Sequence, residues 1–229
     1  KILVQAGYNI FISGATSTGK TTFLNVLADY IPKTERVITI EDSAELQLHD
    51  IANLVRMEVR QADAEGVSSV TLRDLIKASL RMRPDRIIVG EVRGPEALDM
   101  IQSMNTGHDG SLSTGHANSP EDMLSRIETM ILMGSDMPLP AIRKQIASSI
   151  DIIIQLGRLR DRSRRVTEIT EVLSCDQNGY VLNKLFQFNE RDDLLRETSV
   201  YGNAPEKVRG GLDRSEERRV GKECRSRWS

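Results

Sequence analysis

Gly14-Ala15-Thr16-Ser17-Thr18-Gly19-Lys20-Thr21 decides the fold of this chain, because it matches the phosphate-binding pattern G-x-x-x-x-G-K-[ST]. Residues 9–13 precede this loop and are apolar enough to predict a short buried strand. Residues 21–30 follow it, with apolar side chains at helical spacing. A strand, a glycine-rich loop and a helix in this order predict a nucleotide site rather than an ordinary turn.

The residue types of the loop suit a polyphosphate. Gly14 and Gly19 let the backbone bend, so that successive N–H groups can point at phosphate oxygens. A helix that begins at Lys20 adds the positive end of its dipole. The Lys20 ammonium can reach the β- and γ-phosphates, and the Thr21 hydroxyl is placed to bind Mg²⁺. We therefore expect ATP and Mg²⁺ at Gly14 to Thr21.

The bulk composition limits the possible partners. The chain has 229 residues and a formal net charge of −2, which gives no basic surface for nucleic acid. Its apolar runs are too short to predict a membrane span, so we expect no direct membrane insertion. The first residue is Lys1, and a phosphate loop at position 14 suggests a chain that starts inside a larger protein.

The two ends of the chain differ in character. Residues 1–189 are expected to form one motor domain, and residues 190–213 are polar with no predicted fold. Residues 214–229 resemble the translation of a short-read sequencing adapter, so we expect a non-native tail. The alternative for this segment is a genuine basic tail that binds an acidic surface.

Alternating short strands and helices follow the loop. Strands are expected over 36–40, 54–59, 86–90 and 111–114, helices over 71–81, 95–104, 119–133 and 140–149, and further strands over 150–159, 165–174 and 180–188. A hairpin turn is expected at 176–179, with Asn178-Gly179 at its centre. This order predicts a RecA-like α/β core of the P-loop NTPase type, with a β-hairpin extension at the C-terminal end.

Hydrolysis requires an acid near the metal, a group that orients water and a sensor for the γ-phosphate. Candidates stand at predicted strand ends, where a parallel sheet places its ligand crevice. Each has an alternative: a helix cap for the Glu-Asp pair, a surface ion pair with Arg93 for the second glutamate, and zinc binding for the two histidines. The candidates are Glu41, Asp42, Glu91, His108 and His116.

Three further motifs resemble those of the secretion-ATPase superfamily, which powers type II and type IV secretion and pilus assembly. They are residues 38–42, like its Asp box, 83–94, like its atypical Walker B motif, and 106–118, like its His box. The residue sequences of these motifs are most similar to those of the Flp/Tad pilus assembly ATPases, the CpaF-like branch. The likeness covers about residues 1–188.

The resemblance implies roles for individual residues. Glu41 would polarise the attacking water, Glu91 would hold Mg²⁺ or its water, and His116 would contact the γ-phosphate. Gly90 replaces the usual Walker B aspartate, which leaves the division of labour between the two glutamates open. Phosphate and Mg²⁺ would be bound by Lys20, Thr21 and Thr22, with Asp42, Arg93 and His108 in support.

The resemblance also implies a homohexameric motor at the inner face of the cytoplasmic membrane, in the cytoplasm, that works with inner-membrane platform proteins. The family's N-terminal domain and any arginine it supplies are absent from this chain, so weak ATP binding and slow turnover are expected. Two other functions stay open, an ATP-binding regulatory module and a conjugation-type DNA-transfer ATPase. Internal arginines that could neutralise the γ-phosphate are Arg73, Arg81, Arg83 and Arg93.

Overall fold

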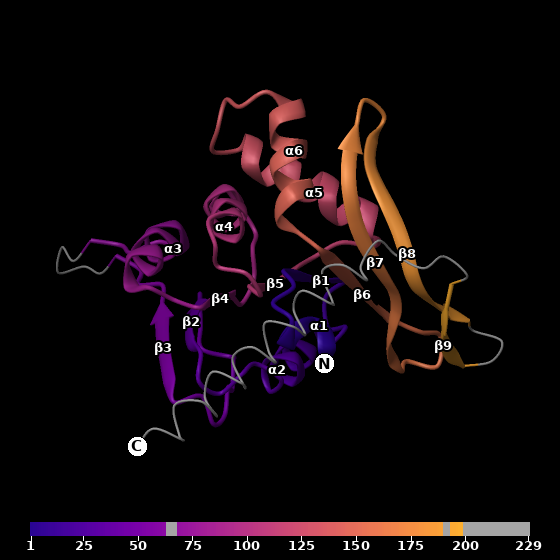
Figure 1. Cartoon of the computed structure of the whole chain (residues 1–229), viewed down its shortest axis with the longest axis horizontal. Coiled ribbons are helices and arrows are strands. Elements are labelled where there is room, and N and C mark those ends of the chain that lie inside the picture. The colour runs from indigo at the N-terminus through magenta and orange to yellow at the C-terminus, as the bar shows by residue number, and fades with distance from the viewer. Residues whose placement is uncertain (63–67, 190–192, 199–229) are drawn as a thin grey trace, which may run out of the picture.

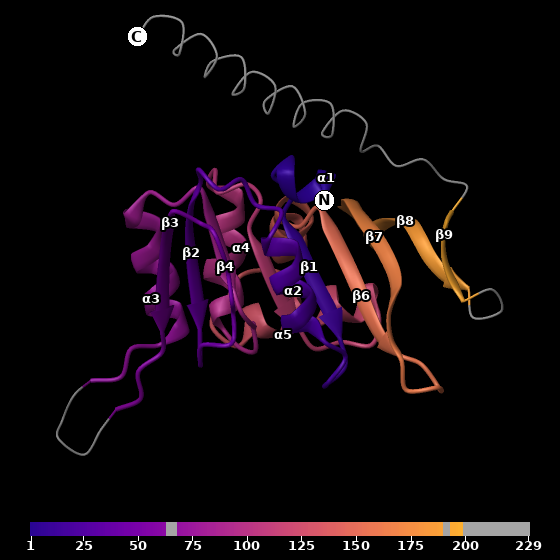
Figure 2. The ribbon, with the colours of Figure 1, turned by 90° about the horizontal axis from the view of Figure 1, so that it is seen from below.

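A single mixed sheet runs through the computed structural model, which describes residues 1–62, 68–189 and 193–198 (Figure 1). Its strands are β1 (Ile10–Gly14), β2 (Arg36–Glu41), β3 (Asn53–Glu58), β4 (Arg86–Val89), β5 (Leu112–Gly115), β6 (Ile152–Arg158), β7 (Arg164–Asp176), β8 (Gly179–Asn189) and β9 (Leu194–Glu197). They lie in the order β3-β2-β4-β5-β1-β6-β7-β8-β9, and Figure 2 shows the sheet from β3 at one edge to β9 at the other.

The first six strands of that order are parallel, from β3 to β6. Their carboxyl ends therefore meet at one edge of the sheet, where ligands of α/β folds bind. β7, β8 and β9 continue the sheet in antiparallel pairs. The predicted α/β core with a C-terminal β extension is thereby confirmed.

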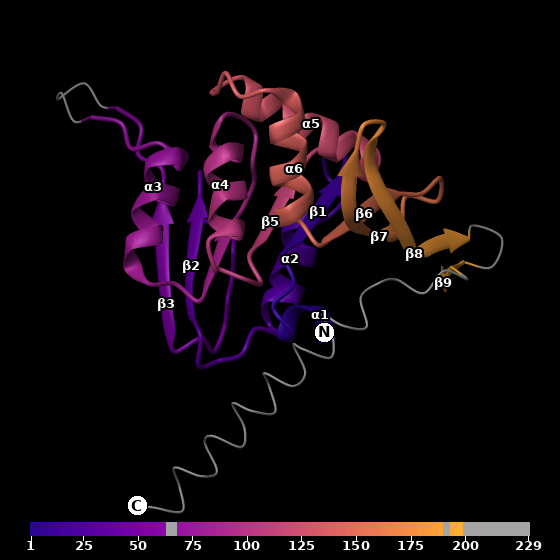
Figure 3. The ribbon, with the colours of Figure 1, turned by 45° about the horizontal axis from the view of Figure 1, so that its top comes forward.

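Helices cover both faces of the sheet (Figures 1 and 3). One face packs against α3, α4, α5 and α6, and the other against α1 and α2. None of the helices in the described ranges combines the length and the apolar composition that a membrane span requires. The bounds are α1 (Ile2–Gln5), α2 (Lys20–Ala28), α3 (Leu72–Ser79) with a 3₁₀ turn at Leu80–Met82, α4 (Glu96–Asn105), α5 (Pro120–Leu132) and α6 (Leu139–Ser149).

Two predicted helix starts are confirmed by their caps. At α3, the Thr71 hydroxyl accepts the Asp74 N–H, and the Asp74 carboxylate accepts the Thr71 N–H in return. At α5, the Ser119 side chain accepts the Asp122 N–H at 3.0 Å. Such side-chain oxygens satisfy backbone donors that have no partner within the helix.

The hairpin between β7 and β8 differs from the prediction at its turn. Asp176 pairs with Gly179 in the sheet, so the central residues are Gln177 and Asn178 rather than Asn178-Gly179. The reason is the Asp176 side chain, whose Oδ1 accepts the N–H groups of Asn178 and Gly179 at 2.7 and 3.1 Å. This aspartate turn closes the loop one residue earlier.

Two short elements were not predicted. α1 has four residues, and β9 has four residues that are all exposed, so neither carries a periodic apolar pattern. β9 lies inside the segment 190–213, for which the sequence predicted no fold. The proposed adapter-derived tail, 214–229, lies outside the described residues.

Candidate active site

A cavity of about 580 Å³ opens at the carboxyl edge of the parallel strands, beside the end of β1. Elements distant in sequence contribute to it: the loop after β1, the ends of β2 and β4, the residue after β5 and the start of β7. The structure thus brings most of the predicted site residues together. These residues are Thr16, Ser17, Gly19, Lys20, Thr21, Thr22, Glu41, Asp42, Glu91, Arg93 and His116.

Two glycines give the phosphate loop its shape. Gly19 has φ of 91°, in the left-handed region, and immediately precedes α2 as its N-cap. A Cβ at Gly14 would lie 2.8 Å from the Leu156 carbonyl oxygen, so β6 leaves no space for a side chain there. Within the described residues no side chain caps α2, so its first N–H groups remain for an anionic ligand.

Lys20 is buried at the base of the cavity. Its Nζ donates to the carbonyl oxygens of Gly14 at 3.1 Å and Ala15 at 3.0 Å, and it lies 3.2 Å from His116 Nδ1. Burial lowers the pKa of Lys20, and the nearby Glu91 carboxylate opposes this shift. A phosphate at this position would stabilise the charged ammonium and compensate for its burial.

His116 connects Lys20 to Glu91. Since an ammonium can only donate, Nδ1 of His116 is the acceptor, and the ring proton belongs on Nε2, which faces Glu91 Oε1. Burial and the Lys20 charge lower the pKa of His116 from its ordinary value of 6.5, and Glu91 opposes them. The imidazole is therefore mainly neutral at neutral pH, and it forms a relay by contacting the Lys20 ammonium on one side and the Glu91 carboxylate on the other.

Glu91 is held from a second direction by Arg93. Arg93 Nε donates to Glu91 Oε2 at 2.7 Å, and Arg93 Nη2 contacts the same oxygen. Arg93 also lies 4.0 Å from the exposed Asp42 carboxylate. The hydrogen bond to Glu91 is the main cause of a raised pKa at Arg93, and the negative charges of Glu91 and Asp42 add to the increase. Glu91 is thus already engaged by a cation and an imidazole.

Glu41 has a different environment. It is 5% exposed, and its Oε1 accepts the N–H groups of Glu45 at 3.0 Å and Leu46 at 2.9 Å. Burial raises the pKa of Glu41, and the two backbone N–H groups oppose this shift. A Cβ at Gly90 would lie 3.0 Å from Glu41 Cγ, so the glycine at the Walker B position makes room for this glutamate.

A hydroxyl and a carboxylate meet where a metal ion would be expected. Thr21 Oγ1 donates to Glu45 Oε2 at 3.2 Å, and both residues line the cavity with Glu91. Oxygen donors of this kind suit Mg²⁺, which is usually bound by one or two carboxylates together with substrate phosphates. The residues present therefore fit the expected metal.

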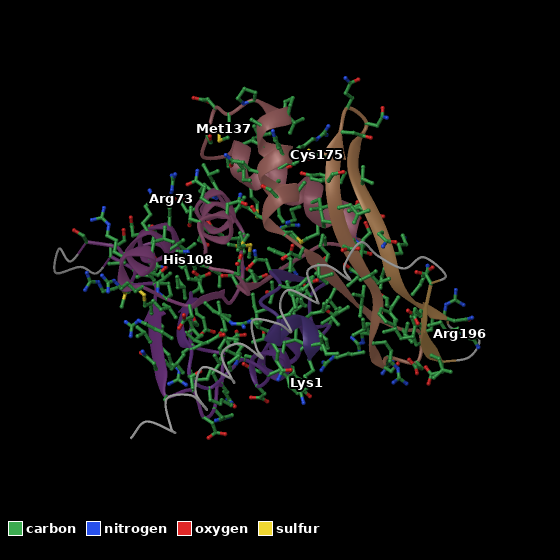
Figure 4. The ribbon with its side chains drawn as sticks, viewed as in Figure 1. Lys1, Arg73, His108, Met137, Cys175 and Arg196 are labelled. Carbon is green, nitrogen blue, oxygen red and sulfur yellow. The ribbon has the colours of Figure 1, made fainter. Side chains whose placement is uncertain are left out.

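Some predicted residues lie elsewhere. His108 stands before β5, at the opposite end of that strand from His116, and its Nδ1 donates to the Ser103 carbonyl oxygen at 3.2 Å (labelled in Figure 4). Arg73, also labelled there, lies on α3 and pairs with Asp99 at 2.6 Å. Of the four candidate arginines, Arg93 is the one that lines the described cavity.

Sequence reasoning missed two charged residues that line the cavity, Glu45 and Arg164. Glu45 stands four residues after Glu41 in the same loop, so its proximity to the motif was an available signal. Arg164 belongs to β7, far from Lys20 in the sequence. Its position beside the phosphate loop depends on how β6 and β7 pair. No local pattern indicates that pairing.

Comparison with known proteins gives relatives that include conjugal transfer and type IV secretion proteins. The chain is 38% identical over 167 residues to a putative conjugal transfer protein of Mycobacterium tuberculosis, covering 73% of this chain and 47% of that protein. It is 41% identical over 172 residues to the type IV secretion system protein VirB11 of Bartonella henselae, covering 72% and 47%. The chain spans about half the length of these relatives.

A solved structure is also similar. The crystal structure of the VirB11 ATPase from the Brucella suis type IV secretion system, in complex with sulphate, matches with a TM-score of 0.66 and 34% identity. This match covers 73% of this chain and 49% of that chain. Residues 1–204 match the family described as type II/IV secretion system protein. Since that match spans most of its length, the chain belongs to the type II/IV secretion system protein family.

Proposed function

We propose that this chain is the ATP-hydrolysing motor part of a secretion or pilus assembly ATPase. One observation carries the proposal: a single cavity holds the phosphate loop, the buried Glu41, and the Lys20–His116–Glu91 relay. A site for binding alone would need the loop but not the acids. The names of the relatives, which include a secretion-system ATPase, support the same assignment.

The phosphate loop would hold the triphosphate. The free N–H groups at the start of α2 and the loop backbone would donate to phosphate oxygens, and Lys20 would leave its carbonyl partners to reach the β- and γ-phosphates. Thr21 and Thr22 follow on the first turn of α2 and line the same cavity. Binding and alignment of this kind supply most of the catalysis in phosphoryl transfer.

Glu41 is the better candidate for activating water. The two backbone N–H groups occupy Oε1 and leave Oε2 to accept a proton from the attacking water. The pKa of Glu41 is raised toward neutral pH, and a general base is most effective when its pKa is near the working pH. Glu91 is paired with Arg93 and contacts His116, so it is better suited to hold His116 in position.

His116 would report the state of the γ-phosphate. Its Nδ1 accepts from Lys20 only while that ammonium lies toward the loop carbonyls, so movement of Lys20 onto phosphate would release this nitrogen. Thr21, Glu45 and Glu91 would supply the oxygens that hold Mg²⁺. Mg²⁺ supplies neutralisation of charge on the phosphate oxygens when it is bound.

The biological setting is part of the proposal. The residue sequences of the motifs favour the Flp/Tad pilus assembly branch. In that branch, a homohexamer in the cytoplasm would act on inner-membrane platform proteins and drive pilin or protein export. The Mycobacterium relative is named as a putative conjugal transfer protein, which favours DNA transfer as a second candidate. Stimulation of turnover by single-stranded DNA, with a steep salt dependence, would support that second function.

Steady-state phosphate release from Mg²⁺-ATP tests the proposed reaction. We expect the wild-type chain to release phosphate and Lys20→Ala to lose nucleotide binding. Turnover of Glu41→Gln should be at least about 100-fold lower than that of the wild-type chain. Glu58→Gln is the matched control, because Glu58 is exposed on β3 and is the register partner of Glu41 in the sheet. A Glu41→Gln variant as active as Glu58→Gln would exclude Glu41 as the base.

A further inference from the structure

We propose that Arg164 binds the α- and β-phosphates of the nucleotide, from the side of the loop opposite to the catalytic acids. The inference rests on the proposed function and adds to it a residue that no sequence motif contains. Arg164 is the first residue of β7 and lines the same cavity as Lys20 and Glu41.

The sheet register brings Arg164 to the phosphate loop. β1 ends at Gly14, which pairs with Leu156 of β6. β6 continues beyond this point to Arg158, and Arg158 pairs with Arg164. The β6–β7 pair therefore extends past the end of β1 and forms a wall beside the loop that follows it (Figure 2).

The approach to the loop is close. A Cβ built on Gly19 would lie 3.5 Å from Arg164 Cδ. Gly19 precedes Lys20 directly, and the N–H groups at this point of a phosphate loop cradle the α- and β-phosphates. The guanidinium starts one bond beyond Cδ, so it is within reach of a diphosphate bound on these N–H groups.

Arg164 differs from Arg93, the other arginine of the cavity, in having no acidic partner among the described residues. Lys20 Nζ is held by two carbonyls and His116, and Arg93 is paired with Glu91. Among residues 1–62, 68–189 and 193–198, no carboxylate lies within ion-pair distance of Arg164, whereas the adjacent Arg165 pairs with Asp193 at 3.0 Å. An unpaired guanidinium at the wall of an anion site is free to form two parallel bonds to phosphate.

Strand order assigns Arg164 to one end of the nucleotide. β1 lies between β5 and β6, so His116, directly after β5, and Arg164, at the start of β7, approach the loop from opposite sides. Glu91 follows β4, which lies beyond β5 on the His116 side. The γ-phosphate belongs with these catalytic groups, and Arg164 therefore faces the part of the ligand that ADP and ATP share.

The turn that carries Arg164 is ordered by its own hydrogen bonds. Leu159 and Ser163 are joined by a backbone bond of 2.9 Å, and the Asp161 carboxylate accepts both the N–H and the hydroxyl of Ser163. Arg160 lies in the same turn, is exposed, and is outside the cavity lining. It is therefore a matched control for removal of one positive charge from this hairpin.

The test measures binding of Mg²⁺-ADP and of inorganic pyrophosphate to the full chain by calorimetry, and single-turnover hydrolysis at saturating ATP. For Arg164→Ala we expect affinity for both ligands to fall about 10-fold to 100-fold, as loss of a charge-assisted bond predicts. The saturated single-turnover rate should change less than about 3-fold, because the γ-phosphate contacts remain. Arg164→Lys should recover part of the affinity, and Arg160→Ala should match wild type.

Two results would overturn the inference. Unchanged affinity in Arg164→Ala would exclude a phosphate contact, and a loss for ADP without a loss for pyrophosphate would move the contact to the nucleoside. In both cases wild type would still bind nucleotide and the proposed function would stand. If the wild-type chain bound neither ligand, the proposed function itself would fail, and the inference with it.

Discussion

At the scale of single residues, burial gives Glu41 its properties. A carboxylate that is 5% exposed is poorly solvated, and the backbone N–H groups of Glu45 and Leu46 offset only part of this cost. The same burial that makes Glu41 more basic makes the folded chain less stable while the group is charged. Stability and catalysis therefore oppose each other at this residue, as is common at active sites.

This conflict predicts that Glu41→Gln stabilises the chain at neutral pH. Because the folded-state pKa of Glu41 is raised, its ionisation removes stability as the pH rises from its ordinary value of 4.5 through the folded-state pKa. Gln keeps an oxygen for the two N–H groups and carries no charge. Thermal denaturation should give similar Tm values near about pH 4 and a higher Tm for the variant near about pH 7.

The matched control for that measurement is Glu58→Gln, on the exposed side of the edge strand β3. It removes the same charge from the same part of the sheet. A gain in Glu41→Gln no larger than the gain in Glu58→Gln would show that burial of Glu41 is not its cause.

At the scale of elements, the site depends on where each strand ends and the next helix begins. β1, β2, β4 and β5 each place functional residues at or just beyond their carboxyl ends. α5 follows the His116 segment after three residues, and its start is fixed by the Ser119 cap. Capping thus contributes to the position of the segment that carries His116.

Ser119→Ala should lower the free energy of unfolding by about 1 kcal/mol, because the Asp122 N–H loses its acceptor. Urea denaturation measures the change. Ser125→Ala is the control, since Ser125 is exposed inside α5 and Ala favours the helix interior. Equal stability of Ser119→Ala and Ser125→Ala would show that the cap contributes nothing measurable.

At the scale of the whole molecule, one buried side chain ties the amino ends of the central strands together. Asn9 precedes β1 and is 5% exposed. Its Oδ1 accepts the N–H groups of Gly110 and Ser111, each at 3.0 Å, and its Nδ2 donates to the Ser149 carbonyl at 2.8 Å. It therefore joins the segment before β5 and the last residue of α6 to β1, on the edge opposite to the site.

Asn9→Ala should be strongly destabilising, because three buried backbone groups lose their partner at about 1–3 kcal/mol each. The midpoint of urea unfolding measures the loss. Asn25→Ala is the comparison, since Asn25 accepts one exposed bond, from the Gln47 N–H. A loss for Asn9→Ala no greater than that for Asn25→Ala would contradict the role of Asn9 as a tie.

The sequence predicted those parts of the fold that depend on local patterns. Buried parallel strands are continuous apolar runs, so the sequence predicted β1, β2 and β4. The phosphate loop that begins at Gly14 indicated the edge of the sheet at which a ligand would bind. Arg164 was missed because its position depends on the pairing of β6 with β7. The turn before Gly179 was misplaced because a side-chain bond from Asp176 decides it.

Single-turnover conversion of Mg²⁺-ATP, at equal nucleotide occupancy for wild type and Glu41→Gln, tests most directly whether these side chains form one hydrolytic site. We expect both proteins to bind ATP equally and the variant to convert it to ADP at least about 100-fold more slowly. Equal rates in the two proteins would contradict this expectation.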